Sequence, residues 1–217
     1  GVVPPAGSRG WRGIPAGARA IRASPAASRA LACLVLAHAA MVLLMTMTPV
    51  HMHHHGQGVA LVGFVISGHV IGMFAFSPVV GIVADRFSSR ASIALGAGIL
   101  LVAAAVAIGW AETMGGISVS LFFLGLGWSF VMIPAAATVS NGASDDVRTL
   151  VQGTSDAVMN IVAALAAGLS GPLMARFGFG NLSWAVVIMA LAIGWLARGM
   201  SLPTAKANLP GQVTSEA

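Results

Sequence analysis

Residues 81–90 read GIVADRFSSR and place one acid and two arginines between two long apolar segments. Each segment has the roughly 20 mainly apolar residues that a helix needs to cross a hydrocarbon core about 30 Å thick. Gly81 would let the span that precedes the loop, the second of the chain, approach a neighbouring helix closely. Asp85 and Arg86 would end that span and Arg90 would begin the next, so an ion pair in this loop would bias one conformation of the bundle.

The composition is that of an integral membrane protein, with 57% hydrophobic and 8% charged residues, whereas soluble proteins have about a quarter charged residues. The net charge is +5, but the arginines lie in the N-terminal tail and short loops. We therefore expect the lipid bilayer and its headgroups as partners, and no nucleic acid. The sequence contains no nucleophile, base and acid set and no phosphate-binding loop, so we expect no enzyme activity and no cofactor.

Six segments are long and apolar enough to span a membrane, and the connections between them are short. Apolar residues cover every face of these segments, which favours an all-α protein with six transmembrane helices over a barrel. The predicted spans are Ala30 to Thr48, Val59 to Val83, Ala91 to Trp110, Ile117 to Thr138, Leu150 to Ala175 and Leu182 to Ala197.

The basic residues predict the orientation, because arginine and lysine in short flanking segments stay in the cytoplasm. With the N-terminus inside, only Arg176 falls on the outer side, and both termini are cytoplasmic. The excess of arginine over lysine is typical of GC-rich bacterial genomes. We expect a multi-pass protein of the bacterial plasma (inner) membrane.

Residues 1–28 combine prolines and glycines with four arginines and no acid, a composition that buries no core. This part of the chain is predicted to be a flexible basic cytoplasmic linker, whose arginines could also touch anionic lipid. Residues 29–200 would form the transmembrane bundle, and residues 201–217 a cytoplasmic tail.

The loop after the second span resembles the signature of the major facilitator superfamily, in which a glycine is followed four positions later by an aspartate and then by basic residues. The matching positions are Gly81, Asp85, Arg86 and Arg90. Ser88 stands where that pattern usually has glycine, and Ser89 where it usually has a basic residue. In that family the signature lies between the second and third helices of each six-helix half, as it does among these six spans.

The resemblance implies that this chain is similar to the C-terminal half of a transporter, with an inverted repeat of three plus three helices. An N-terminal six-helix half would then be its missing partner. The implied function is proton-coupled efflux of a small-molecule substrate by alternating access, with protons as the coupling ion. Asp85, Arg86 and Arg90 would hold the cytoplasmic gate.

A second resemblance concerns four residues of the fifth span, which are similar to the small-residue and Gly-Pro motif of proton-coupled drug exporters. They are Ala167, Gly171, Pro172 and Ala175. Close packing of small residues between neighbouring helices explains the same residues without any transport.

Ionisable groups inside spans are costly and therefore candidates for function. Four residues of the fifth span recur every fourth position and share one helical face, which predicts a cavity beside it. They are Arg148, Gln152, Asp156 and Asn160. Asp156 would either carry a proton or form an ion pair with Arg148, Arg86 or Arg90.

Two lone histidines lie in predicted spans, His38 in the first and His69 in the second. An imidazole titrates near neutral pH, so either residue is a candidate proton carrier. Each is alternatively a neutral group bonded to a neighbouring helix. Ser67, Gly68 and Gly72 leave room beside His69 for water or a ligand.

The segment HMHHH at residues 51–55 would lie in an outer loop, with His51, His53, His54 and His55 as weak candidate metal ligands. Metal capture, proton-sensitive gating and a solvated loop are all compatible with it, so no metal site is assigned. The alternatives to a small-molecule exporter are a transition-metal transporter that uses this loop and a non-transporting, half-size membrane scaffold.

Overall fold

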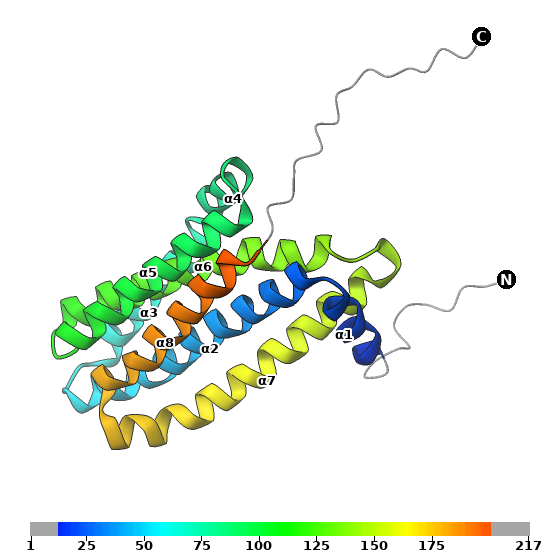
Figure 1. Ribbon diagram of the computed structural model, residues 1–217. Coiled ribbons are helices and arrows are strands. Elements are labelled where there is room, and N and C mark those ends of the chain that lie inside the picture. The colour runs from blue at the N-terminus through cyan, green and yellow to red at the C-terminus, as the bar shows by residue number, and fades with distance from the viewer. Residues whose placement is uncertain (1–12, 201–217) are drawn as a thin grey trace, which may run out of the picture.

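The structure is a computed structural model that describes residues 13–200. Within this range the chain forms eight α-helices and no strand (Figure 1). They are α1 (Ile14–Ala23), α2 (Pro25–His54), α3 (Val59–Phe74), α4 (Ser77–Arg86), α5 (Ser89–Trp110), α6 (Met114–Asn141), α7 (Asp145–Phe177) and α8 (Phe179–Arg198). The predicted C-terminal tail lies outside the described residues.

All six predicted spans are confirmed as helical segments long and apolar enough to cross a membrane. Most of the helices extend several residues past the predicted ends, because polar side chains cap them beyond the apolar stretch. Ser24 Oγ accepts a hydrogen bond of 3.2 Å from the amide of Ala27 at the start of α2. Thr113 Oγ1 accepts one of 3.0 Å from the amide of Gly116 at the start of α6.

The second span consists of two helices, α3 and α4, with a break in the helix between them. Ala75 and Phe76 separate the two helices, and Pro78 stands in the first turn of α4. Proline lacks the amide that would bond to the carbonyl of Phe74, and its ring crowds that carbonyl. The sequence analysis predicted one continuous span here and did not predict this break.

The centre of the bundle is formed by α2 and α6. Helix α2 contacts α6, α7 and α8, helix α6 contacts α2, α3 and α5, and α5 packs on α8. Ser92 Oγ donates to the carbonyl of Phe130 (3.1 Å) and Ser120 Oγ to that of Ala103 (2.9 Å), so two buried hydrogen bonds join α5 to α6. Fully buried side chains of this core include Leu44, Ile93, Leu100, Leu124, Val131 and Ile193.

Helix α1 packs beside α7, although the sequence analysis placed residues 1–28 in a flexible linker. Its apolar residues recur at helical spacing, so that Gly17 and Ile21 are buried while Arg19 and Arg22 are exposed. Gly17 lies so close to the α7 backbone at Leu150 that a larger side chain would clash. The part of the predicted linker before residue 13 is outside the described residues.

Burial differs widely among the spans. The buried share of the most apolar window is 61% in α6, but 22% in the α3 and α4 span and 11% in α7. Phe64 and Phe74 on α3, and Ile161, Leu165 and Leu169 on α7, are more than half exposed. Helices α3 and α7 therefore present broad apolar faces that residues 13–200 do not cover.

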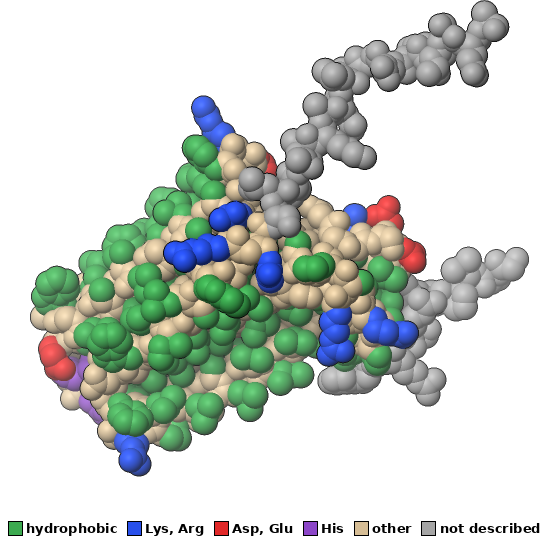
Figure 2. Space-filling model, in the orientation of Figure 1, with side chains coloured by type: hydrophobic (Ala, Val, Ile, Leu, Met, Phe, Trp, Pro, Cys, Tyr) green, Lys and Arg blue, Asp and Glu red, His purple; other side chains and the backbone are tan. Residues whose placement is uncertain are grey.

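The two ends of the bundle differ in charge, because successive helices run in opposite directions. One end, here called the basic end, carries the arginines at the starts of α2, α5 and α7 and at the ends of α4 and α8. Figure 2 shows blue side chains gathered there. The opposite end, called the histidine end, carries residues 51–55, Glu112 and Arg176.

Candidate functional site

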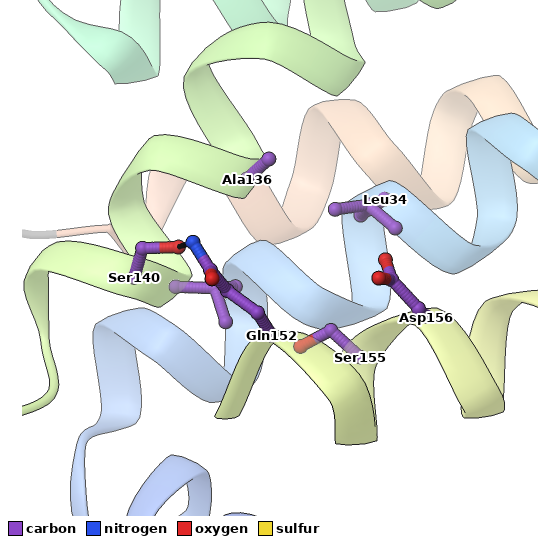
Figure 3. A pocket seen from close by; sticks show the side chains of 7 residues that line it. Leu34, Ala136, Ser140, Gln152, Ser155 and Asp156 are labelled. Atoms are coloured by element: carbon purple, nitrogen blue, oxygen red, sulfur yellow. Dashed lines mark hydrogen bonds between the residues drawn. The ribbon is translucent and has the colours of Figure 1, made fainter. Parts of the chain in front are cut away.

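A cavity of about 240 Å³ lies between α2, α6 and α7, on the half of the bundle nearer the basic end. Its wall combines apolar side chains with an amide, hydroxyls and a carboxylate: Leu34, Ala136, Val139, Ser140, Gln152, Ser155 and Asp156. Figure 3 shows the polar groups of Gln152 and Asp156 projecting from α7 toward α6 and α2. Two residues of the predicted polar stripe thus face a common space.

Asp156 is exposed at this cavity, and it forms no salt bridge with any residue in the range 13–200. Arg148 instead pairs with Asp145, with 3.0 Å between Nη2 and Oδ1. Asp145 lies on the adjacent helical turn, whereas Asp156 is eight residues from Arg148, or about 12 Å along the helix. The expected ion pair of Asp156 with Arg148, Arg86 or Arg90 is therefore not formed here.

The other members of the stripe have different surroundings. Gln152 Nε2 donates a hydrogen bond of 3.3 Å to Ser140 Oγ, which links α7 to the end of α6. Asn160 is exposed, and its Nδ2 donates to the backbone carbonyl of Asp156 at 2.8 Å. Asn160 does not line the cavity, so the polar groups that reach this space come from the Gln152 and Asp156 turns.

His38 lies one helical turn beyond Leu34 on α2 and faces α6. Its Nδ1 accepts a hydrogen bond of 3.2 Å from Nε1 of Trp128, whose side chain is nearly buried. The neutral ring then carries its proton on Nε2. His38 is half-buried, and it is not among the residues that line the cavity.

His69 is fully buried between α3 and α6 and does not line the cavity beside Asp156. Its Nδ1 donates a hydrogen bond of 2.8 Å to the carbonyl of Leu121, while the buried Nε2 has no partner among the described residues. Gly125 makes room for it, because a Cβ there would meet the backbone and ring of His69. A Cβ on Gly68 would meet no atom within 4 Å, whereas one on Gly72 would meet the backbone of Phe122.

The charged loop lies at the basic end and is open to its surroundings. Asp85, Arg86 and Arg90 are exposed, and none of them forms an ion pair with a described residue. A Cβ on Gly81 would meet no described atom within 4 Å, so the expected close approach of this glycine does not occur within residues 13–200. The charged residues of the loop signature therefore form no ion pair among the described residues that would fix one conformation.

The turn within this loop has an unusual backbone. Ser88 has φ 149° and ψ 160°, the positive-φ region that favours glycine, and it is the one non-glycine residue with positive φ among those described. Its Oγ accepts a hydrogen bond of 3.1 Å from the amide of Ala91 and caps α5. The serine thus keeps the turn at a cost in backbone strain.

The histidine segment is helical and not the loop that was expected, because α2 continues to His54. His51 is buried: its Nε2 donates to the carbonyl of Ala111 (3.0 Å), and its ring stacks on Phe179 with 4.4 Å between centroids. Packing against the ends of α5 and α8 thus extends the helix past the apolar stretch. Exposed His53 and His54 remain on its outer side.

His55 connects the end of α2 to the loop after α5. Its Nδ1 donates to the carbonyl of His51 (2.9 Å) and its Nε2 to Oε2 of Glu112 (2.8 Å). Both partners are acceptors, so the backbone carbonyl first and Glu112 second raise the pKa of His55 above its ordinary value. Across residues 13–200, no group of three or more His, Cys, Asp or Glu side chains has the arrangement of a metal site.

The Gly-Pro segment of the fifth span lies on α7, which continues through Pro172. A Cβ on Gly171 would meet no atom within 4 Å, so this glycine does not serve close packing in the part of the chain that the structure describes. Gly171 and Ala175 instead border a cavity of about 560 Å³ at the histidine end, together with His51, His55 and Glu112.

Several residues of these sites were missed by the sequence analysis. Ser140 and Ser155 border the central cavity, Trp128 holds His38, and Glu112 holds His55. Ser155 directly precedes Asp156. It could have been predicted by including the residues next to those that recur every fourth position on α7. No sequence signal points to the other three, because their partners lie on different helices.

Comparison with known proteins agrees with this architecture. Residues 30–214 match the Major Facilitator Superfamily. Two uncharacterized MFS-type transporters of Bacillus subtilis (strain 168) are similar: YddS is 34% identical over 162 residues and YdeG 36% over 162 residues, in each case 74% of this chain and 37% of the relative. The riboflavin transporter RfnT of Brucella anthropi is 33% identical over 160 residues, 73% of this chain and 40% of that protein.

The chain thus spans about two fifths of the length of these curated relatives. The match covers all six membrane-spanning segments. The chain belongs to the major facilitator superfamily of membrane transporters, and its six spans form an MFS-like half bundle.

Proposed function

We propose that the protein is a secondary transporter that exports small organic molecules in exchange for protons by alternating access. The observation that carries this proposal is the cavity between α2, α6 and α7, where Asp156 has no ion-pair partner among the described residues. A carboxylate in a membrane bundle gains a proton where it is buried and loses it where water reaches it. Asp156 would therefore be the proton carrier.

Other polar residues near Asp156 would bind the substrate or carry protons. Gln152 lines the same cavity, and Asn160 continues the exposed face of α7 toward the membrane interior. His38 lies on α2 one turn beyond Leu34, which lines the cavity, and the unpartnered Nε2 of buried His69 would be a second proton acceptor. These four residues are the remaining candidates for coupling.

The loop of residues 81–90 would act as the conformational gate at the basic end. Its candidate residues are Gly81, Asp85, Arg86 and Arg90. Asp85, Arg86 and Arg90 are exposed and form no ion pair with a described residue, which leaves them available to a second helical bundle. Breaking such contacts would accompany the change from one open side to the other.

The second bundle would be an N-terminal six-helix half that covers the apolar faces of α3 and α7. Their low burial, 22% and 11%, supports this partner, and so does the length of the relatives. We further propose that the protein lies in the bacterial plasma membrane with the basic end in the cytoplasm. Residues 1–28 would then connect the halves, and residues 201–217 would be a cytoplasmic tail.

The proposed substrate class is a small organic molecule. A relative named a riboflavin transporter supports this class over a metal ion. The histidine end adds no support for metal transport, because His51 and His55 already bond to carbonyl and carboxylate oxygens.

The test uses the intact protein that carries this chain, reconstituted in vesicles with an imposed pH gradient. Riboflavin and the fluorescent cation ethidium serve as the transported probes, and a trapped pH indicator records proton movement. Asp156→Asn should reduce gradient-driven flux of a transported probe at least about tenfold, because the amide binds no proton at neutral pH. Exchange of probe across the membrane without a gradient should persist.

Asp145→Asn is the matched control, since it removes a carboxylate from the same helix. The Asp145 side chain is 91% exposed. This variant should keep gradient-driven flux. Flux that stays fully gradient-dependent in Asp156→Asn would exclude Asp156 as the carrier, and gradient-independent transport by the unmodified protein would exclude proton coupling altogether.

A further inference from the structure

A groove of about 410 Å³ runs between α5 and α8 and is here called the α5–α8 groove. Arg90, at the start of α5, and Arg198, the last residue of α8, line it at the basic end. The rest of its wall is small or apolar and includes Leu101 and Trp195. No acidic side chain is among the residues that line it.

The length of the groove corresponds to one leaflet of a bilayer. Leu101 follows Arg90 by eleven residues on α5, which is about 16 Å of helix at 1.5 Å per residue. This distance is roughly half of a hydrocarbon core of about 30 Å. An elongated apolar ligand lying along the groove would therefore reach from the membrane surface to the middle of the bilayer.

The groove is open because small residues form its floor. A Cβ on Gly98 would meet no atom within 4 Å, and one on Gly194 would meet only the Cβ of Ala97, at 4.0 Å. Beside this floor, the Trp195 side chain is 71% exposed and Leu191 is 58% exposed. Apolar walls with an unfilled floor suit a flexible hydrocarbon chain.

The mouth of the groove carries positive charge without a compensating acid. Neither Arg90 nor Arg198 forms an ion pair with a described residue. The guanidinium of Arg29 packs against Gly199, directly after α8, and adds a third cation near the mouth. Basic pockets between transmembrane helices on the cytoplasmic side bind anionic lipid headgroups.

This groove is separate from the proposed transport cavity. No residue lines both spaces, since the cavity lies between α2, α6 and α7. Figure 2 shows hydrophobic side chains over α5 and α8 with basic side chains gathered at one end of that face. A ligand of the α5–α8 groove would therefore bind from the surrounding membrane and not along the transport path.

We propose that the α5–α8 groove is a binding site for one anionic phospholipid of the cytoplasmic leaflet. Its phosphate binds between Arg90 and Arg198, and one acyl chain lies along Gly98 and Gly194 toward Leu101. Charge complementarity and the one-leaflet length favour this occupant over a protein segment or a second copy of the chain. The site goes beyond the proposed transport function; its leaflet follows from the proposed orientation, and Arg90 would belong both to this site and to the proposed gate.

The test measures quenching of Trp195 fluorescence by lipids with brominated acyl chains in vesicles that contain the intact protein. The Trp195 component is the difference between the unmodified protein and Trp195→Phe. Brominated phosphatidylglycerol should quench this component at a lower mole fraction than brominated phosphatidylcholine. In the double variant Arg90→Gln and Arg198→Gln this preference should disappear, with a loss of about fivefold in relative affinity for each arginine.

The charge-matched control is the double variant Arg19→Gln and Arg22→Gln, which removes two exposed arginines from α1 at the same end of the bundle. It should keep the preference for phosphatidylglycerol. Gly98→Leu fills the groove and leaves the arginines, so it should weaken quenching by both lipids. Excess inorganic phosphate should not displace the lipid, because phosphate alone lacks the acyl contact.

Equal quenching by the two lipids in the unmodified protein would overturn the proposal, as would an unchanged preference in the Arg90 and Arg198 variant. Absence of quenching by either lipid would mean that protein covers the groove. Retained quenching in Gly98→Leu would show that the acyl chain does not lie in the groove. A loss of the preference for phosphatidylglycerol in the α1 control variant would assign the effect to general surface charge. Thermal unfolding of each variant in detergent provides the folding control.

Discussion

At the level of single residues, the backbone of Ser88 is the clearest source of local strain. Its positive φ costs of the order of 1–3 kcal/mol for a residue with a Cβ. Glycine adopts this geometry freely, and replacing a serine cap by glycine costs only a few tenths of a kcal/mol. Ser88→Gly should therefore raise the free energy of unfolding by about 1 kcal/mol, measured by denaturant titration in detergent.

Ser88→Ala serves as the comparison, because it keeps the Cβ and removes the hydroxyl that caps Ala91. It should lower the free energy of unfolding by about 1 kcal/mol. If Ser88→Gly were the less stable of the two, the strain assigned to residue 88 would be wrong.

A second residue-level prediction concerns the pH dependence of the histidine end. The backbone carbonyl of His51 and then Glu112 raise the pKa of His55 above its ordinary value of 6.5. Because the folded pKa is the higher one, the stabilisation is complete below about pH 6.5 and is lost as the pH rises through the raised value. Glu112→Gln should therefore lower the melting temperature more at about pH 5.5 than at about pH 8.5.

Melting curves of the unmodified protein and of the variant at both pH values provide this measurement. His53→Gln is the control, because His53 is exposed on the same helical turn and should show no such pH-dependent difference. A Glu112→Gln effect that is equal at the two pH values would rule out the imidazolium contact.

Individual functional residues were predictable where their signal lay within one helix. Gln152 and Asp156 follow from fourfold spacing on α7, and both reach the same cavity. The burial of His51 was not predictable, because it depends on Ala111 and Phe179 from two other helices. The expected partner of Arg148 was wrong for a different reason, since Asp145 lies three residues away on the same helix and was overlooked.

At the level of helices, the six spans follow from apolar length alone, while two features do not. Helix α1 is short and basic, and the composition of its surroundings hid its helical spacing of apolar residues. The break between α3 and α4 needs the position of Pro78 and not only the hydropathy of the segment. Length and hydropathy therefore predict which segments cross the membrane, and local chemistry decides how each is built.

The contact between α3 and α6 provides a stability prediction for helix packing. A Cβ on Gly125 of α6 would clash with the carbonyl of His69 on α3. A Cβ on Gly68, the residue before His69, would meet no atom within 4 Å. Gly125→Ala should lower the free energy of unfolding by about 1–3 kcal/mol through overpacking. Gly68→Ala should leave it equal or slightly higher, because alanine favours the helix.

Thermal unfolding followed by tryptophan fluorescence in detergent would compare the two variants. Equal stability of Gly125→Ala and Gly68→Ala would mean that α3 and α6 do not approach each other as closely as described here.

At the level of the whole molecule, the separation of charge between the two ends predicts how the bundle crosses the membrane. Ser144 lies at the basic end and Gln57 at the histidine end, and the buried Cys33 is the one cysteine in the chain. In cells, Gln57→Cys should react with a membrane-impermeant maleimide, whereas Ser144→Cys should react only after permeabilisation.

The unmodified chain provides the background, because Cys33 is inaccessible within the bundle. Labelling in the opposite pattern would place the basic end outside and would also move the proposed lipid site to the other leaflet.

The break at residues 75 and 76 would allow α4 to pivot relative to α3. Helix α4 has ten residues, about 15 Å of helix, and the charged loop lies at its far end. A bend of roughly 10° at the joint would move that loop by about 2–3 Å while α3 stays packed on α6. An angular change too small to disturb the core would thus be magnified at the membrane surface into a displacement sufficient to exchange ion-pair partners.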